Sequence, residues 1–282
     1  MSLARRLWSR YEPLHDVVYF SPYAREAATA LGLKGYWMGY FAFRAAPLGA
    51  VGPAPVTAAF FGFAPRRVER ALPDAWRYTA PEQALAARAE AAGRALRDAF
   101  GPALDVGAAA DLVWDASRRA DIAGRPLAAA NQALPRPDDP VVALWLATTV
   151  LREHRGDGHN AVLVARGIGP LEAHHLKVAA DETDPDMLRL GRGFTDDEWR
   201  EGRAALIRRG WLDAGGRLTE AGMAEHRAVE EQTDRAADGP WRALGPERAE
   251  RALRALQPLR DAVLATGQIP AGNPVGMVET AR

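Results

Sequence analysis

Residues 194–222 read FTDDEWREGRAALIRRGWLDAGGRLTEAG, and this stretch decides the fold class. Thr195 and Glu198 form an S/T-x-x-E capping box, in which each side chain bonds a backbone amide at a helix N-terminus. A helix should therefore start directly after Thr195 and end at Gly210. The turn sequence DAGG separates two short extended pieces, WLD and RLT, and Thr219 can cap the next helix. The stretch predicts a helix, a hairpin and a second helix.

Helical signals dominate the rest of the chain. After Pro22, YAREAATALG has apolar residues at helical spacing and closes on Gly32, as a glycine after a helix should. PEQALAARAEAAGRALRDAF begins on a proline and ends before Gly101, which predicts a long amphipathic helix. APVTAAFFGF and APRRVERALPDAW indicate two short helices joined by a tight turn. Helix, short turn and helix form the skeleton of a helix-turn-helix.

A proline-rich segment divides the chain into halves of similar size. With 282 residues, the chain is long enough for two domains with cores of their own. The sequence PRPDDP at 135–140 is the predicted boundary between them. We therefore expect an N-terminal helical, helix-turn-helix-like domain over 1–134 and a C-terminal winged-helix domain over 138–282.

Several blocks of residues carry a family resemblance. LIRRGWLDAGGRLTEAG resembles the recognition-helix end, the wing and the following helix of winged-helix proteins of the MarR type. YFSPYAREAATALGLKGYW, AAPLGAVGPAPVTAAFFGFAP and EHRGDGHNAVLVARG resemble an actinobacterial family of two-domain helix-turn-helix-like proteins, and this resemblance covers nearly the full length. It implies a mainly α fold with two winged-helix-like domains arranged as an internal pseudo-dimer. It does not supply an activity.

The charge pattern disfavours DNA binding by such a fold. The 36 basic residues equal the 36 acidic residues, whereas a nucleic-acid binder usually has a basic surplus. The predicted helix TDDEWREGRAALIRR carries four carboxylates against four arginines, and its first turn is acidic. APRRVERALPDAWR in the first half has a modest basic surplus. A MarR-like transcriptional regulator is therefore the alternative, and a DNA-repair enzyme with tandem winged helices meets the same objection.

If it does not bind DNA, a fold with two winged-helix-like domains can instead enclose a small molecule between them. LREHRGDGHN at 151–160 supplies His154 and His159, and we expect a glycine turn between them with Asp157 capping the next helix. The two histidines straddle that turn, unlike metal ligands on one helical face, so the metal remains unassigned. Histidine is the natural proton carrier near neutral pH, and His159, His154 and His15 are the candidate catalytic residues. A solvent-exposed helix end explains His154 equally well.

Aromatic residues supply the predicted opposite wall of the pocket. Tyr36, Trp37, Tyr40 and Arg44 lie at helical spacing, and His15 and Tyr19 share a helix face. Such a set suits an aromatic or apolar ligand oriented by a few polar groups, although aromatics at this spacing are also typical of a core. The full set of predicted ligand-binding residues is Tyr19, Tyr36, Trp37, Tyr40, Arg44, Arg155, Asn160 and His174.

Other features limit the chemistry. The chain has no cysteine, which excludes disulfides, thiolate metal sites and cysteine nucleophiles. There is no P-loop, no G-x-G-x-x-G and no G-x-S-x-G, so NTPase, dinucleotide and hydrolase-elbow motifs lack support. No uncharged run is long enough to span a bilayer, and the N-terminus lacks the apolar core of a signal peptide. We expect a cytoplasmic protein with a small-molecule partner and an unassigned cofactor.

Overall fold

The structure is a computed structural model, and it describes residues 1–282 except 103, 181–183, 271–272 and 274–282. This part of the chain is mainly α-helical, and its one pairing of extended residues is an antiparallel bridge between Leu212 and Leu218. The helices are α1 (Leu3–Phe20), α2 (Pro22–Ala30), α3 (Gly35–Ala45), α4 (Pro53–Ala59), α5 (Pro65–Glu69), α6 (Pro81–Phe100), α7 (Gly107–Arg118), α8 (Pro126–Gln132), α9 (Pro140–Ala165), α10 (Pro170–Ala179), α11 (Pro185–Arg192), α12 (Asp196–Arg208), α13 (Glu220–Ala237), α14 (Gly239–Leu244) and α15 (Pro246–Ala265). Among these helices, none is long and apolar enough to cross a membrane.

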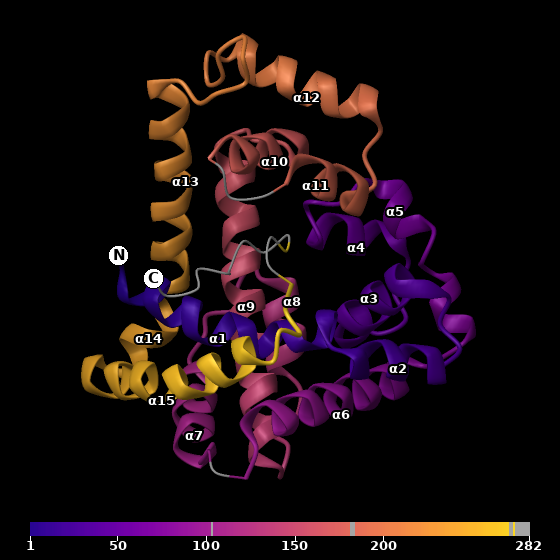
Figure 1. The fold of residues 1–282 in the computed structure, drawn as a ribbon, viewed down its shortest axis with the longest axis vertical. Helices are drawn as coiled ribbons and strands as arrows, with labels where there is room; N and C mark the ends of the chain where they lie inside the picture. The colour runs from indigo at the N-terminus through magenta and orange to yellow at the C-terminus, as the bar shows by residue number, and fades with distance from the viewer. Residues whose placement is uncertain (103, 181–183, 271–272, 274–282) are drawn as a thin grey trace.

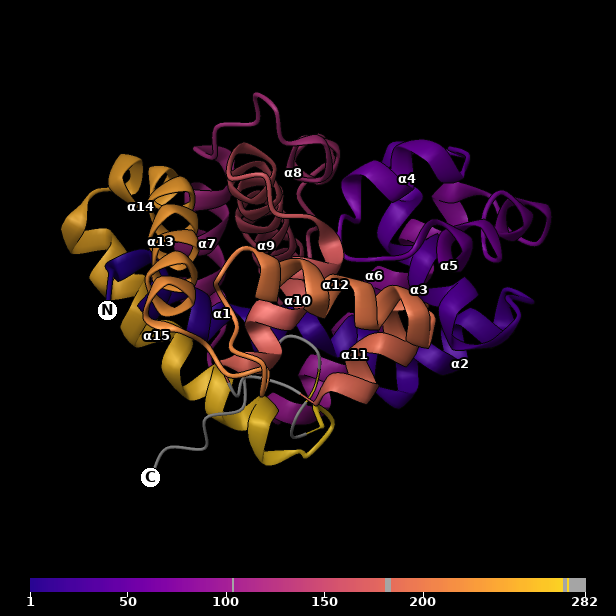
Figure 2. The same cartoon turned by 90° about the horizontal axis from the view of Figure 1, so that it is seen from above.

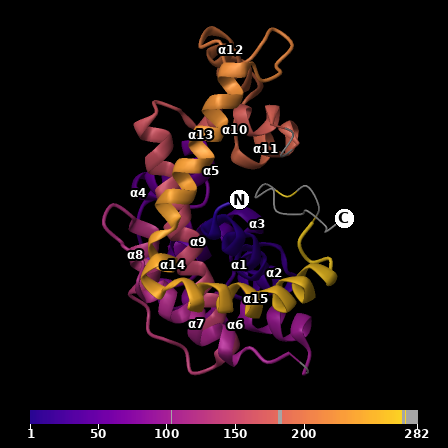
Figure 3. The same cartoon turned by 90° about the vertical axis from the view of Figure 1, so that its left-hand side faces the viewer.

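Helix α9 is the axis of the molecule (Figure 1). Its 26 residues span about 39 Å at 1.5 Å per residue. Helices α1, α6, α7, α8 and α13 pack along it. Helices α10, α11 and α12 lie beyond one end, and α13 runs back from them alongside α9 (Figure 3). Seen from above, α13 to α15 lie on one side of α9 and α2 to α5 on the other (Figure 2).

Two buried clusters hold these helices together. The larger takes residues from α1 to α9 and from α13 to α15, among them Tyr11, Phe41, Trp145 and Trp241. It therefore includes side chains from both sides of 135–140, and the domain boundary there stays a prediction. The smaller cluster lies under α10, α12 and the hairpin and consists of Leu163, Ile168, Leu176, Leu206, Leu212 and Val229.

The locally encoded helix ends are confirmed. Thr195 and Glu198 bond each other's backbone amides, and α12 starts at the next residue. The Thr219 hydroxyl accepts from the Gly222 amide at the start of α13. Gly32 follows α2 with a φ of 76°, a left-handed conformation that glycine adopts without strain. The hairpin between α12 and α13 is also present.

The turn expected at Gly156 and Gly158 is wrong, because α9 continues through both glycines. Packing explains the glycine at 158: a Cβ there would lie 2.5 Å from Arg125 Nη1 and 3.2 Å from the Ala236 Cβ. The Arg125 guanidinium lies in that space and donates to the carbonyls of His154 and Ala236. Close contact between α9 and α13 thus offsets the cost of a helical glycine, about 1 kcal/mol.

Asp157 is also not the cap of its own helix. Its Oδ2 accepts from the amides of Leu127 and Ala128, at 3.0 and 2.9 Å, in the first turn of α8. These amides have no partner within α8, since the first four N–H groups of a helix lack one. Asp157 therefore caps a helix that begins 31 residues earlier in the chain. His159 and Asn160 lie in the interior of α9, so no helix starts at these residues.

Candidate ligand site

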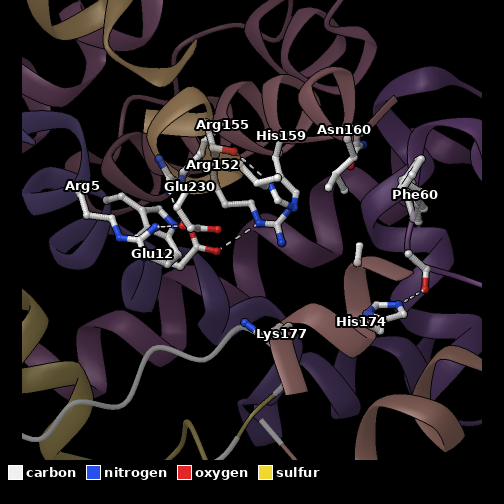
Figure 4. Close-up of a pocket in the computed structure, with 18 of the residues that line it drawn as sticks. Arg5, Glu12, Phe60, Arg152, Arg155, His159, Asn160, His174, Lys177 and Glu230 are labelled. Atoms are coloured by element: carbon white, nitrogen blue, oxygen red, sulfur yellow. Dashed lines mark hydrogen bonds and ion pairs between the residues drawn. The ribbon is translucent and has the colours of Figure 1, made fainter. Parts of the chain in front are cut away.

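A cavity of about 1430 Å³ lies between two groups of helices. Helices α1, α9, α13 and α15 form one side, and α3, α4, α10, α11 and the segment after α4 form the other. Ligand pockets in proteins usually measure roughly 300–1,000 Å³, so this cavity can hold a large small molecule. Figure 4 shows part of it, with Arg152 and His159 on α9 pointing in from one side and Lys177 and His174 on α10 from the other.

Among the described residues, the cavity is lined by nine cationic side chains and two carboxylates. Arg5, Arg6 and Arg10 come from α1, Arg152 and Arg155 from α9, and Arg260 from α15. Arg44, Lys177 and Arg192 come from α3, α10 and α11. The carboxylates are Glu12 and Glu230. The lining is thus strongly basic although the whole chain is neutral.

Several of these cations are held by buried carboxylates. Arg44 makes a two-bond contact with Glu153, with Nε and Nη2 each 2.8 Å from a carboxylate oxygen. Arg152 lies 3.2 Å from Glu12 and 3.3 Å from the same Glu153. Burial by itself would raise the pKa of Glu153, but Arg44 and Arg152 outweigh it and lower that pKa to about 2. Glu153 therefore stays ionised and fixes two arginines along the wall of the cavity.

Arg192 differs from its neighbours because no carboxylate of the described residues pairs with it. Its guanidinium lies 4.4 Å from the centre of the Phe63 ring and bonds to Tyr40. Burial lowers the pKa of Arg192, and the positive charges of Arg44 and Arg152 lower it further. Three guanidinium groups from α3, α9 and α11 therefore act on one another across this part of the cavity.

The aromatic wall is formed by α3 and the segment that follows α4. The ring centres of Tyr40 and Phe63 are 5.5 Å apart, and those of Tyr40 and Phe60 are 6.3 Å apart. Asn160 Nδ2 donates to the Ala59 carbonyl at 3.0 Å, and His174 Nε2 donates to the Gly62 carbonyl at 2.8 Å. Two polar side chains, one from α9 and one from α10, thus hold this aromatic segment in place.

His159 is the predicted catalytic histidine that lines the cavity. Its Nδ1 lies 2.9 Å from the Thr233 hydroxyl on α13. Burial lowers the pKa of His159 to about 4, and this outweighs the opposing effect of Glu230. His159 is therefore neutral at pH 7, with an imidazole that can accept a proton from a bound molecule.

The other predicted residues divide into two groups. Those that line the cavity with His159 are Tyr40, Arg44, Arg155, Asn160 and His174. Those that do not line it are His15, Tyr19, Tyr36, Trp37 and His154.

The residues outside the cavity have structural neighbours instead. The buried His15 ring bonds Thr149 at 2.9 Å and Tyr19 at 3.0 Å, within the core between α1 and α9. Trp37 stacks beneath Arg67, with 5.0 Å from the guanidinium to the ring centre. The buried His154 has its pKa lowered to about 4 by burial and by the charge of Arg125.

Sequence reasoning missed most of the cavity's cations. Arg152, Arg155 and His159 follow at spacings of three and four on α9, and Arg5, Trp8 and Glu12 repeat the pattern on α1. Such spacing places side chains on one helix face. Because a turn was expected at 156–158, the sequence did not show that Arg152 shares a helix face with Arg155 and His159. Nothing in the sequence indicates that α1 and α9 pack against each other. Among the described residues, no group of three or more His, Cys, Asp or Glu side chains lies close enough to hold a metal ion.

The helix-turn-helix predicted in the first half corresponds to α4 and α5, and in the second half α11 and α12 precede the hairpin. Helices α11 and α12 are joined at Gly193, which has a φ of 84°. Glu198 pairs with Arg66 of α5, and Asp196 pairs with Arg189 of α11. The acidic first turn of α12 is therefore engaged in contacts within the chain.

A model described as a helix-turn-helix family matches residues 4–270. No curated protein and no solved structure matches the chain.

Proposed function

Because the chain belongs to a helix-turn-helix family, and because its helices surround a large basic cavity, we propose that the protein binds a small molecule there. One observation carries the proposal: nine cationic side chains and an aromatic wall converge on a single cavity. Six of these cations are paired with carboxylates of the described residues, whereas Arg192 has no carboxylate partner among them. Burying a cation without a counter-ion is expensive, so a cavity in which a bound anion could supply one is suited to a ligand.

The charges around α12 support this reading over DNA binding. Base readout needs arginine or lysine at the start of a recognition helix. In α12 that turn carries Asp196, Asp197 and Glu198. The arginines of α5 that would supply phosphate contacts are engaged within the chain: the exposed Arg66 pairs with Glu198, and the half-buried Arg67 donates to the Leu190 carbonyl.

Chemistry on the ligand would fall to His159. It is the candidate that lines the cavity and is neutral at pH 7, so it would act as a general base toward a bound proton donor. His154 and His15 have no part in this proposal, because neither lines the cavity. Metal-assisted chemistry would need ligands from the bound molecule.

The second candidate is a MarR-like transcriptional regulator. The family match favours it, as do α11, α12 and the hairpin after them in the order of a winged helix. In this view α4 and α5 are the counterpart in the first half, giving the internal pseudo-dimer. The Ala64 amide of that half bonds the Arg192 carbonyl at 3.0 Å. A cytoplasmic location fits either function.

Native mass spectrometry of the full chain, purified from its own host, tests the proposal. We expect a mass excess that disappears on denaturation, accompanied by a released small molecule. Band-shift assays with labelled promoter DNA at physiological salt test the alternative. Apo protein that shifts this DNA specifically, and carries no ligand, would establish the regulator instead.

A further inference from the structure

The cavity is asymmetric in its chemistry. Its aromatic side consists of Tyr40, Phe60 and Phe63, and Leu163 and Leu188 lie among the apolar residues of the lining. The Arg192 guanidinium lies 4.4 Å from the centre of the Phe63 ring, and the Arg44 guanidinium lies 4.2 Å from the centre of the Phe60 ring. Arg152 lines the same cavity. An apolar surface and a cationic one therefore meet inside one cavity.

The cations at this junction are not fully neutralised by the protein. Glu153 is shared between Arg44 and Arg152, and Glu12 also pairs with Arg152. Arg192 adds a third positive charge, and no carboxylate of the described residues contacts it. The three arginines face two carboxylates, and one positive charge is left over.

The positions of these groups suit an anion. Figure 4 shows Arg152 on α9 and Lys177 on α10 on opposite sides of the cavity. A guanidinium presents two parallel N–H donors that match the oxygens of a phosphoryl or carboxylate group. Tyr40 adds a hydroxyl next to Arg192. An anionic group between these residues would offset the mutual repulsion of the arginines.

We propose that the ligand is an organic anion, with a phosphoryl or carboxylate group held by Arg152 and Arg192 and an aromatic or apolar body against Tyr40, Phe60 and Phe63. This inference rests on the proposed small-molecule function and specifies its ligand class. The anion joins α9 to α11, and the apolar body packs on α3 and the segment after α4.

Three probes separate the two parts of the ligand: 2-naphthyl phosphate, 2-naphthol and inorganic phosphate. Isothermal titration calorimetry with the full chain measures each dissociation constant. We expect 2-naphthyl phosphate to bind at least tenfold more tightly than either of the others, because only it reaches both surfaces. Its affinity should also fall as salt is added.

Variants then assign the anion contact. Arg192→Met keeps much of the apolar stem, and we expect it to weaken 2-naphthyl phosphate at least tenfold while changing 2-naphthol less than twofold. Arg192→Lys should restore part of the loss. Arg77→Met is the matched control, since Arg77 is exposed, lies outside the cavity lining and should have no effect. Circular dichroism verifies that each variant is folded.

The possible failures are distinguishable. If 2-naphthol binds as tightly as 2-naphthyl phosphate, the anion contact is wrong and the small-molecule function stands. If inorganic phosphate binds as tightly, the apolar contact is wrong. If none of the three probes binds, the proposed ligand class is rejected, whereas the small-molecule function is decided by the native mass spectrometry of protein from its own host.

Discussion

Replacing Glu153 by glutamine tests the charge arrangement beneath the cavity. Glu153 is 1% exposed, and its two oxygens hold Arg44 and Arg152. Glutamine keeps the shape and removes the charge, which leaves the buried Arg44 without its counter-ion. Removing one partner of a buried ion pair costs about 3–5 kcal/mol. We expect a loss of this size in the free energy of unfolding at pH 7.

The pKa of Glu153 gives a consistent magnitude. It is about 2 in the folded protein against an ordinary 4.5, and at about 1.4 kcal/mol per pH unit this difference corresponds to about 3 kcal/mol. Because the folded-state pKa is lowered, this stabilisation is complete above about pH 4.5 and is lost as the pH falls toward 2. The difference between wild type and Glu153→Gln should therefore shrink by about 1 kcal/mol between pH 5 and pH 3.5.

Urea unfolding followed by tryptophan fluorescence measures both effects. Glu201→Gln is the matched control, because Glu201 pairs with Arg208 while 68% exposed and should cost no more than about 0.5 kcal/mol. A loss below about 1 kcal/mol for Glu153→Gln at pH 7 would refute the reasoning. If the difference in the free energy of unfolding between wild type and Glu153→Gln stays constant from pH 5 to pH 3.5, the assignment of the charge to Glu153 is refuted.

Three further predictions concern α9. Asp157→Ala should lower the free energy of unfolding by about 1–2 kcal/mol, since it removes the side chain that caps α8. Asp157→Asn should lower it by less, and equal losses for the two variants in urea unfolding would contradict the capping role. Gly158→Ala should destabilise the protein, because the new Cβ would meet Arg125. Gly156→Ala should be neutral or stabilising by up to about 1 kcal/mol. A larger loss of stability for Gly156→Ala than for Gly158→Ala would contradict the role of Arg125 packing at residue 158. The His159 ring should stay neutral down to about pH 5, with its pKa lowered to about 4 by burial, and an NMR titration midpoint near 6.5 would show that the ring is solvated.

The individual helix ends were predictable because their determinants are local. Thr195, Glu198 and Thr219 act within three residues of themselves, so the sequence alone places the starts of α12 and α13. The mainly α class followed from such signals and from helical spacing. The same local reasoning failed at Gly156 and Gly158, because a glycine often ends a helix, whereas α9 continues through both and Gly158 leaves room for Arg125.

The cavity was predictable only in part. Six of the predicted site residues line it: Tyr40 and Arg44 share a face of α3, Arg155, His159 and Asn160 come from α9, and His174 comes from α10. Arg192 and Lys177 were missed, since each is an ordinary surface residue of its own helix. Only the packing of α10 and α11 opposite α9 turns them toward a common space.

By itself, then, the sequence determined which segments are helical and where most of them begin, because capping and apolar spacing act over a few residues. Tertiary structure decided that α9 is continuous, that Asp157 caps α8, and that arginines from α1, α3, α9, α11 and α15 meet around one cavity. The physical reason is distance along the chain. Arg44 and Glu153 are 109 residues apart, and their contact depends on how the helices between them pack.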